Sequence, residues 1–208
     1  MSDTDETTVR RESGAPGRRA WTGIAVALAV GAAAIIGARM LRPAPQLRGT
    51  PVEFELRDTS GRVVSDRTLR GRPYAILFGF TRCPDVCPTT LARIAQARAD
   101  LDAGPAPLQV MFVGIDTQHD SPGLLDQYLS RLAPATKGLT GTPEQIERAA
   151  QAFAVYYRRV PVGEGTDFTF DHAATVFLVD RDGRVVDTIG TTDPQDVLTG
   201  KLRRLSRS

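Results

Sequence analysis

The chain has 208 residues, which is enough for one ordinary domain with some additional sequence. Its hydrophobic share of 41% and charged share of 24% are typical of a folded domain and exclude a wholly disordered chain. The formal net charge is only +2, and no basic run with interleaved aromatics is present, so no nucleic-acid partner is expected.

The N-terminal segment divides into a polar part and an apolar part. Residues 1–19 are mixed in charge and lack a periodic apolar face, so we expect a disordered leader. Ala20–Ala38 contains no charged residue, and a bilayer-spanning helix needs about 20 apolar residues. We therefore predict a transmembrane signal anchor over 20–41. Two alternatives stay open: a cleaved signal peptide, for which Gly37–Met40 is a poor cleavage context, and a buried helix of the folded domain.

Arginines flank the apolar stretch on both sides, so the positive-inside rule leans only slightly toward a cytoplasmic leader. The expected location is the bacterial cell membrane, with a single pass, a cytoplasmic N-terminus and an extracytoplasmic domain. The placement of the domain rests mainly on the chemistry described below. Residues 42–50 include Pro43 and Pro45 and are expected to form a short, stiff linker.

Residues 51–208 are expected to form one domain. Apolar runs of strand length alternate there with segments whose apolar residues recur at helical spacing. The expected strands are Val52–Arg57, Arg62–Ser65, Tyr74–Phe80, Leu108–Ile115, Val155–Val160, Ala173–Val179 and Arg184–Ile189. The expected helices are Thr89–Leu101, Ser121–Leu132, Pro143–Phe153 and a last one from Asp193 or Pro194 to about Leu205.

The order of these elements predicts the fold class. It runs from a hairpin through a strand–helix–strand unit and a helical segment to a second hairpin and a last helix. This order describes an α/β protein with a mixed sheet flanked by helices. A pair of cysteines lies at the first strand-to-helix junction of the sheet. We therefore predict a thioredoxin-like fold, preceded by one transmembrane helix.

The chain has only two cysteines, Cys83 and Cys87, with three residues between them. Sites gather where strands end in open α/β sheets, and a helix N-terminus lowers the pKa of a thiol. The neighbouring Arg82 acts in the same direction. Thiolates serve both disulfide exchange and the binding of soft metals, so both roles stay open, beside the alternative of two buried structural thiols.

A complete metal site needs a further ligand, and the chain has two histidines. His172 directly precedes an expected strand, and His119 lies in the loop after another. From the residues alone, either imidazole can reach the cysteine loop, and an exposed loop histidine is more often solvated than a ligand.

Three segments give the chain a family resemblance. The run Gly79–Thr89, which reads Gly-Phe-Thr-Arg-Cys-Pro-Asp-Val-Cys-Pro-Thr, is similar to the signature of the Sco/SenC family of copper proteins. Asp116 with Asp120–Pro122 resembles the acidic segment of that family. Asp171-His172, followed by an expected strand, resembles its Asp-His segment.

The resemblance implies that Cys83, Cys87 and His172 bind copper, as Cu(I), Cu(II) or both, and that His119 is a surface residue. Two thiolates and one imidazole suit this metal. Asp171 is a candidate for orienting His172, or simply ends a strand. Arg82 departs from the family, whose members often carry His or a neutral residue there, and a cation at this place favours thiolates but lies beside a metal cation.

The function implied by the resemblance is that of a copper metallochaperone for the dinuclear copper centre of cytochrome c oxidase. Its implied partners are the copper-containing oxidase subunit, an extracytoplasmic thioredoxin-like reductant and another copper chaperone. The alternative is an enzyme, a membrane-tethered thiol–disulfide reductase with Cys83 and Cys87 as its catalytic pair. A peroxidase of the peroxiredoxin type shares the fold but fits the cysteine spacing less well.

Overall fold

The computed structural model describes residues 47–99, 101, 108–163 and 165–208. The strands are β1 (Glu55–Asp58), β2 (Val63–Ser65), β3 (Tyr74–Gly79), β4 (Gln109–Gly114), β5 (Thr136–Thr140), β6 (Tyr157–Pro161), β7 (Phe168–His172), β8 (Val176–Val179) and β9 (Val185–Ile189). The helices are α2 (Asp66–Leu69), α3 (Val86–Ala99), α4 (Pro122–Leu132), α5 (Pro143–Ala152) and α6 (Gln195–Leu205).

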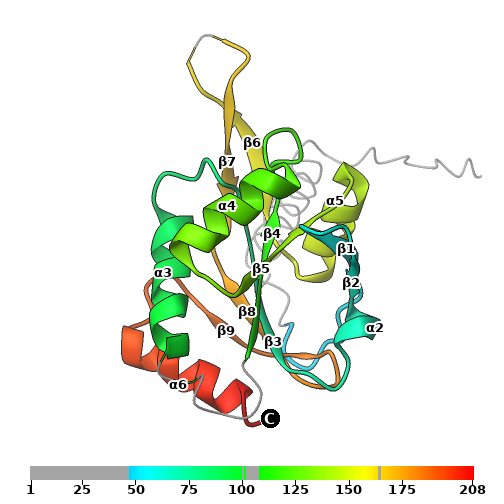
Figure 1. The fold of residues 1–208 in the computed structure, drawn as a ribbon, viewed down its shortest axis with the longest axis vertical. Helices are drawn as coiled ribbons and strands as arrows, with labels where there is room; N and C mark the ends of the chain where they lie inside the picture. Colours follow the sequence, from blue (N-terminus) through cyan, green and yellow to red (C-terminus); the bar gives the residue numbers. More distant parts are fainter. Residues whose placement is uncertain (1–46, 100, 102–107, 164) are drawn as a thin grey trace, which may run out of the picture. The chain divides into compact units, whose positions relative to one another are not determined.

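A seven-stranded mixed sheet forms the centre of the compact unit Leu47–Ser208, in the order β2-β1-β5-β4-β3-β8-β9 (Figure 1). The strands β3, β4 and β5 run parallel, and the outer strands pair antiparallel. β3 lies between β4 and β8 and is buried along its whole length, as its continuous apolar sequence predicts. The predicted mixed sheet flanked by helices is confirmed.

Alternate residues of β3 face opposite sides of the sheet, and each side is covered by helices. Phe78 packs against Phe153, which follows α5, with ring centroids 5.5 Å apart. Gly79 faces the other side, where Cys87 in the first turn of α3 lies directly over it. α3 in turn contacts α4 and α6. The sheet therefore has a buried apolar layer on both faces, and the start of α3 is fixed against the carboxyl end of β3.

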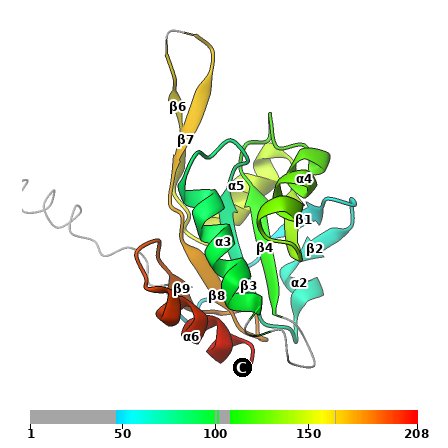
Figure 2. The ribbon, with the colours of Figure 1, turned by 60° about the vertical axis from the view of Figure 1, so that its left-hand side comes forward.

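A second, two-stranded sheet consists of the hairpin β6–β7, which projects beyond the main sheet (Figures 1 and 2). The expected strand Val155–Val160 corresponds to β6, but its partner β7 was not expected. His172 is the last residue of β7 and does not precede a strand directly, because Ala173–Thr175 separate β7 from β8. Because β7 pairs with β6 along its whole length, the backbone stays in the strand conformation as far as His172.

The expected leader and the expected anchor over 20–41 lie outside the described residues, as does most of the linker. Within the described part of the chain, no helix combines the length and the apolar character that crossing a bilayer requires.

Candidate metal centre

The two cysteines lie at the carboxyl end of β3, where the chain turns into α3. The Cys83 N–H donates to the carbonyl of Phe80 at 3.1 Å, which closes the turn. Cys87 is the second residue of α3, and its N–H donates to Sγ of Cys83 at 3.4 Å. Because the first N–H groups of a helix have no partner within the helix, the sulfur of Cys83 takes the place of a capping side chain. The turn and the start of α3 thus bring the two sulfur atoms close together.

The absence of a side chain at Gly79 permits this approach. A Cβ added at Gly79 lies 2.6 Å from Sγ of Cys87 and 2.8 Å from Cζ of Phe112. Both distances are shorter than carbon and sulfur atoms tolerate, so any larger residue displaces the start of α3 or the Phe112 ring. Gly79 thus lets the Cys87 thiol rest directly on the end of β3.

His172 reaches the cysteines from the end of β7. Its Nε2 lies 3.4 Å from Sγ of Cys87. Its ring meets that of Phe80 edge to face, with centroids 5.4 Å apart. The ligand atoms of Cys83, Cys87 and His172 all lie within 4.8 Å of one another. The structure therefore brings together the three residues that the resemblance implied as ligands.

The two thiols differ sharply in acidity. The Cys87 thiol donates a hydrogen bond to the Cys83 sulfur, and this bond, against the opposing effect of burial, lowers the pKa of Cys83 to about 5. Backbone N–H groups of the helix start and the nearby His172 act in the same direction. The same bond raises the pKa of Cys87, because deprotonation would break it, and burial raises the pKa further. At neutral pH the pair holds one thiolate and one thiol.

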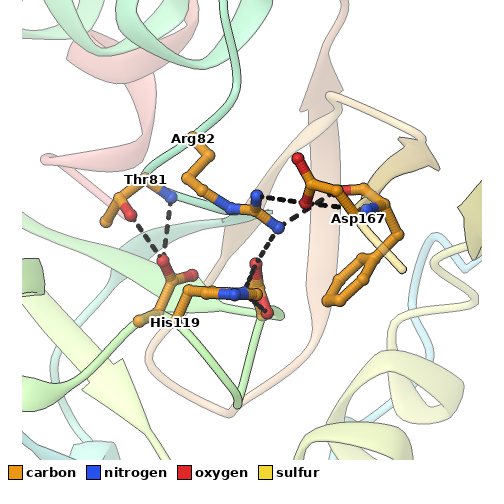
Figure 3. Close-up of polar contacts among 7 residues, drawn as sticks. Thr81, Arg82, His119 and Asp167 are labelled. Carbon is orange, nitrogen blue, oxygen red and sulfur yellow. Dashed lines mark hydrogen bonds and ion pairs between the residues drawn. The ribbon is translucent and has the colours of Figure 1, made fainter. Parts of the chain in front are cut away.

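Arg82 points to carboxylates and not into the cluster of sulfurs. Its guanidinium donates to Asp116 at 3.2 Å, to Asp167 at 2.9 Å and to the backbone carbonyl of Phe168 at 3.0 Å (Figure 3). The hydrogen bond and ion pair with Arg82 hold the pKa of Asp167 below its usual range. The positive charge that lies beside the candidate ligand Cys83 in sequence is thus matched by two negative charges.

The acidic segment after β4 contributes two buried carboxylates. Asp116 is fully buried and accepts from Arg82, and its oxygens also lie 2.8 and 3.0 Å from Nδ1 of His119. Asp120 accepts from both the backbone N–H and the hydroxyl of Thr81 (Figure 3). Both carboxylates therefore hold the cysteine loop to the end of β4, and His119 belongs to this network and not to the Cys83–Cys87–His172 cluster.

Two site residues lacked a clear signal in the sequence. Phe168 is the first residue of β7 and Asp167 directly precedes it, and both contact Arg82, which lies 86 and 85 positions earlier in the chain. Nothing local in their sequence marks them. Asp171, a candidate for orienting His172, adjoins it in β7, where neighbouring side chains point to opposite faces, and it forms an exposed ion pair with Arg158 at 3.9 Å.

The fold and the cluster together define a class: a thioredoxin-like domain with two cysteines and one histidine arranged as ligands for a soft metal. A family model described as SCO1/SenC matches residues 44–207. The chain belongs to the SCO1/SenC family.

Relatives in mitochondria share this sequence at moderate identity. The Protein SCO2 homolog of Bos taurus is 33% identical over 154 residues, which cover 73% of this chain and 58% of the relative. The Protein SCO1 homolog of Homo sapiens is 31% identical over 189 residues, which cover 84% of this chain and 63% of the relative. The chain thus spans less than two thirds of the length of these relatives.

Solved structures extend the comparison to the fold. ScoI of Bradyrhizobium japonicum with copper bound is 34% identical, with a TM-score of 0.68 and coverage of 74% of this chain and 98% of that one. Yeast Sco1 with copper bound is 32% identical, with a TM-score of 0.69 and coverage of 76% and 88%. These two relatives support copper as the metal that suits the cluster.

Proposed function

We propose that this protein binds one copper ion through Cys83, Cys87 and His172 and helps deliver it to the dinuclear copper centre of cytochrome c oxidase. The observation that carries the proposal is the convergence of the three ligand atoms within 4.8 Å. Two relatives of similar sequence and fold have been solved with copper bound. Membership of the SCO1/SenC family supports the oxidase as the recipient.

The donor set favours copper on chemical grounds. Thiolates are soft ligands that select Cu(I), and an imidazole suits both oxidation states. A structural zinc site takes four protein ligands, whereas the cluster in the described part of the chain offers three. Copper is the cargo in this function, and a site of three protein ligands allows both capture and release.

The proposed setting is the outer face of a bacterial cell membrane, with the domain tethered by a single-pass anchor. The partners would be the copper-containing oxidase subunit, a chaperone that supplies copper, and a thioredoxin-like reductant that keeps the cysteine pair reduced. The last partner is needed because two thiols 4.8 Å apart or less can close into a disulfide in an oxidising compartment.

The acidity of Cys83 favours a second candidate, a thiol–disulfide reductase. With a pKa of about 5, Cys83 is a thiolate at neutral pH and can attack a disulfide of a target protein. The attack forms a mixed disulfide and releases one target thiolate. Cys87 then attacks Cys83 after losing its proton, which leaves a Cys83–Cys87 disulfide and a second target thiolate. The pair gives up two electrons, and an external thiol donor restores it.

An anaerobic Cu(I) titration of the reduced full chain tests the first proposal, with His172→Ala and Cys83→Ser in parallel. The expected result is one copper per chain, with affinity lost or severely weakened in both variants. Disulfide exchange should largely persist in His172→Ala, because the two sulfurs carry the exchange and the Cys87 thiol, not His172, contributes most to the acidity of Cys83. Copper binding that is unchanged in His172→Ala, together with rapid disulfide exchange, would make the reductase the better description.

The delivery role needs a separate test in cells. Deletion of the gene should lower the copper content of the oxidase when copper is scarce, and the wild-type chain but not His172→Ala should restore it. Unchanged copper loading after deletion would refute delivery even if the binding site is intact.

A further inference from the structure

The hairpin β6–β7 carries the ligand His172, yet it belongs to a sheet separate from the one that positions the cysteines. Its attachment to the domain therefore depends mainly on side chains. Phe168, Phe170 and His172 alternate along β7 and share one face. Phe170 packs on Phe80 with centroids 5.4 Å apart, and so does His172. A displacement of β7 would thus move His172 relative to the sulfurs.

Arg82 joins the far end of β7 to the cysteine loop. It bonds to Asp167 and to the carbonyl of Phe168 in the hairpin, and to Asp116 after β4 (Figure 3). Its guanidinium carbon also lies 5.2 Å from the centroid of the Phe168 ring. One side chain, adjacent to the ligand Cys83, therefore connects the three segments around the site.

The two carboxylates have different roles in this connection. Asp116 is fully buried, so its bond to Arg82 is shielded from water and fixes the guanidinium to the domain. The Asp167 side chain is 64% exposed and belongs to the hairpin. The guanidinium therefore stays with the cysteine loop, and its bonds to Asp167 and Phe168 hold the hairpin.

We propose that Arg82 is a positioning residue that latches the β6–β7 hairpin and thereby fixes His172 against Cys83 and Cys87. The inference rests on the proposed copper function and deepens it, because it assigns the retention of copper to a residue that is not a ligand. Removal of the latch frees His172 to leave the metal more often, so copper is released faster to a competitor. The number of copper ions bound stays the same.

The test compares Arg82→Gln, Asp167→Ala and the double variant in the full chain loaded with Cu(I). The measured quantity is the rate of copper transfer to an excess of a soluble Cu(I) chelator. We expect Arg82→Gln to speed transfer about tenfold, which corresponds to about 1.4 kcal/mol. Asp167→Ala should speed it several-fold, and the double variant should match Arg82→Gln, since both changes open the same latch. Arg158→Gln, which removes an exposed arginine from the same hairpin, is the matched control and should transfer copper at the wild-type rate.

A second measurement does not depend on copper. In the metal-free chain, nuclear Overhauser contacts between the rings of His172 and Phe80 report the position of His172. They should weaken in Arg82→Gln and Asp167→Ala and persist in Arg158→Gln. If the wild-type chain bound no copper, the proposed function would fail, while these contacts would still decide whether the latch exists.

Two results would overturn the latch. In the first, Arg82→Gln speeds transfer while Asp167→Ala keeps both the wild-type rate and the ring contacts, which means that Arg82 acts on the sulfurs through its charge. In the second, neither variant changes the rate or the contacts. Thermal unfolding of each variant confirms that the comparison is made between folded chains.

Discussion

The unequal acidity of the two cysteines predicts how many protons copper displaces. Both sulfurs must be thiolates in the metal complex, and the protons they carry in the free protein are released on binding. Cys83, with a pKa of about 5, carries a proton in only about one thousandth of the molecules near pH 8. Cys87 keeps its proton there, because its pKa is raised. Cu(I) binding should therefore release about one proton per chain.

Two thiols at their ordinary pKa of 9.0 would behave differently. Each would be protonated in about nine tenths of the molecules near pH 8, so binding would release about 1.8 protons. The count is measured by anaerobic calorimetry in several buffers, since the observed heat changes with the ionisation enthalpy of the buffer in proportion to the protons released. The titration is made near pH 8, which also lies above the pH range in which imidazole groups ordinarily titrate.

A release close to two protons would refute the asymmetry and with it the hydrogen bond from the Cys87 thiol to the Cys83 sulfur. Cys87→Ser supplies the control, because the serine hydroxyl can still donate to Cys83. Residual copper binding by that variant should release almost no proton.

Three further outcomes are expected. His119→Ala should still bind one copper in an anaerobic titration, since His119 lies on Asp116 outside the ligand cluster; a lost equivalent would add it to the ligands. Gly79→Ala should lower the free energy of unfolding in denaturant by about 1–3 kcal/mol and weaken copper binding, because the added Cβ overlaps Sγ of Cys87. An unchanged free energy of unfolding and an unchanged copper affinity would mean that α3 shifts freely. Burial raises the pKa of Asp58, but hydrogen bonds from Ser60 and Arg62 outweigh it and lower the pKa to about 2. The ionised Asp58 therefore stabilises the fold at pH values above its ordinary pKa of 3.8, and this stabilisation is lost as the pH falls through about 2. Asp58→Asn should accordingly cost about 1–2 kcal/mol at pH 7 and little at pH 2 in denaturant titrations, and an equal cost at both values would contradict the assignment.

The parts of the fold with a strong local pattern could be predicted from the sequence. β3 and β4 are continuous apolar runs, and a strand buried on both faces requires such a run. The cysteine pair directly after β3 marked the site, because strand ends and helix starts meet there. The helices α4 and α5 begin with a capping residue followed by Pro, a combination that is legible in the sequence.

The strands β5 and β7 could not be predicted in the same way. β5 reads Thr-Lys-Gly-Leu-Thr, which has neither an apolar run nor a strict alternation, and it forms a strand because β4 and β1 pair with it on either side. β7 depends likewise on β6. Pairing of this kind is set by tertiary neighbours, which local propensity does not contain.

The environment of Arg82 shows that residues other than the candidate ligands contribute to the chemistry of the site. From the sequence, a cation beside Cys83 was expected to stabilise thiolates, at the cost of lying next to a metal cation. The structure turns that side chain toward Asp116 and Asp167, and the acidity of Cys83 follows first from the Cys87 thiol. An arginine can therefore occupy this place in the family without repelling the metal, provided that two carboxylates from distant segments meet it. In a relative with a neutral residue at the position of Arg82, a carboxylate at the position of Asp167 would have no cation to pair with. Comparison of the residues at these two positions in such relatives would show whether the two positions vary together.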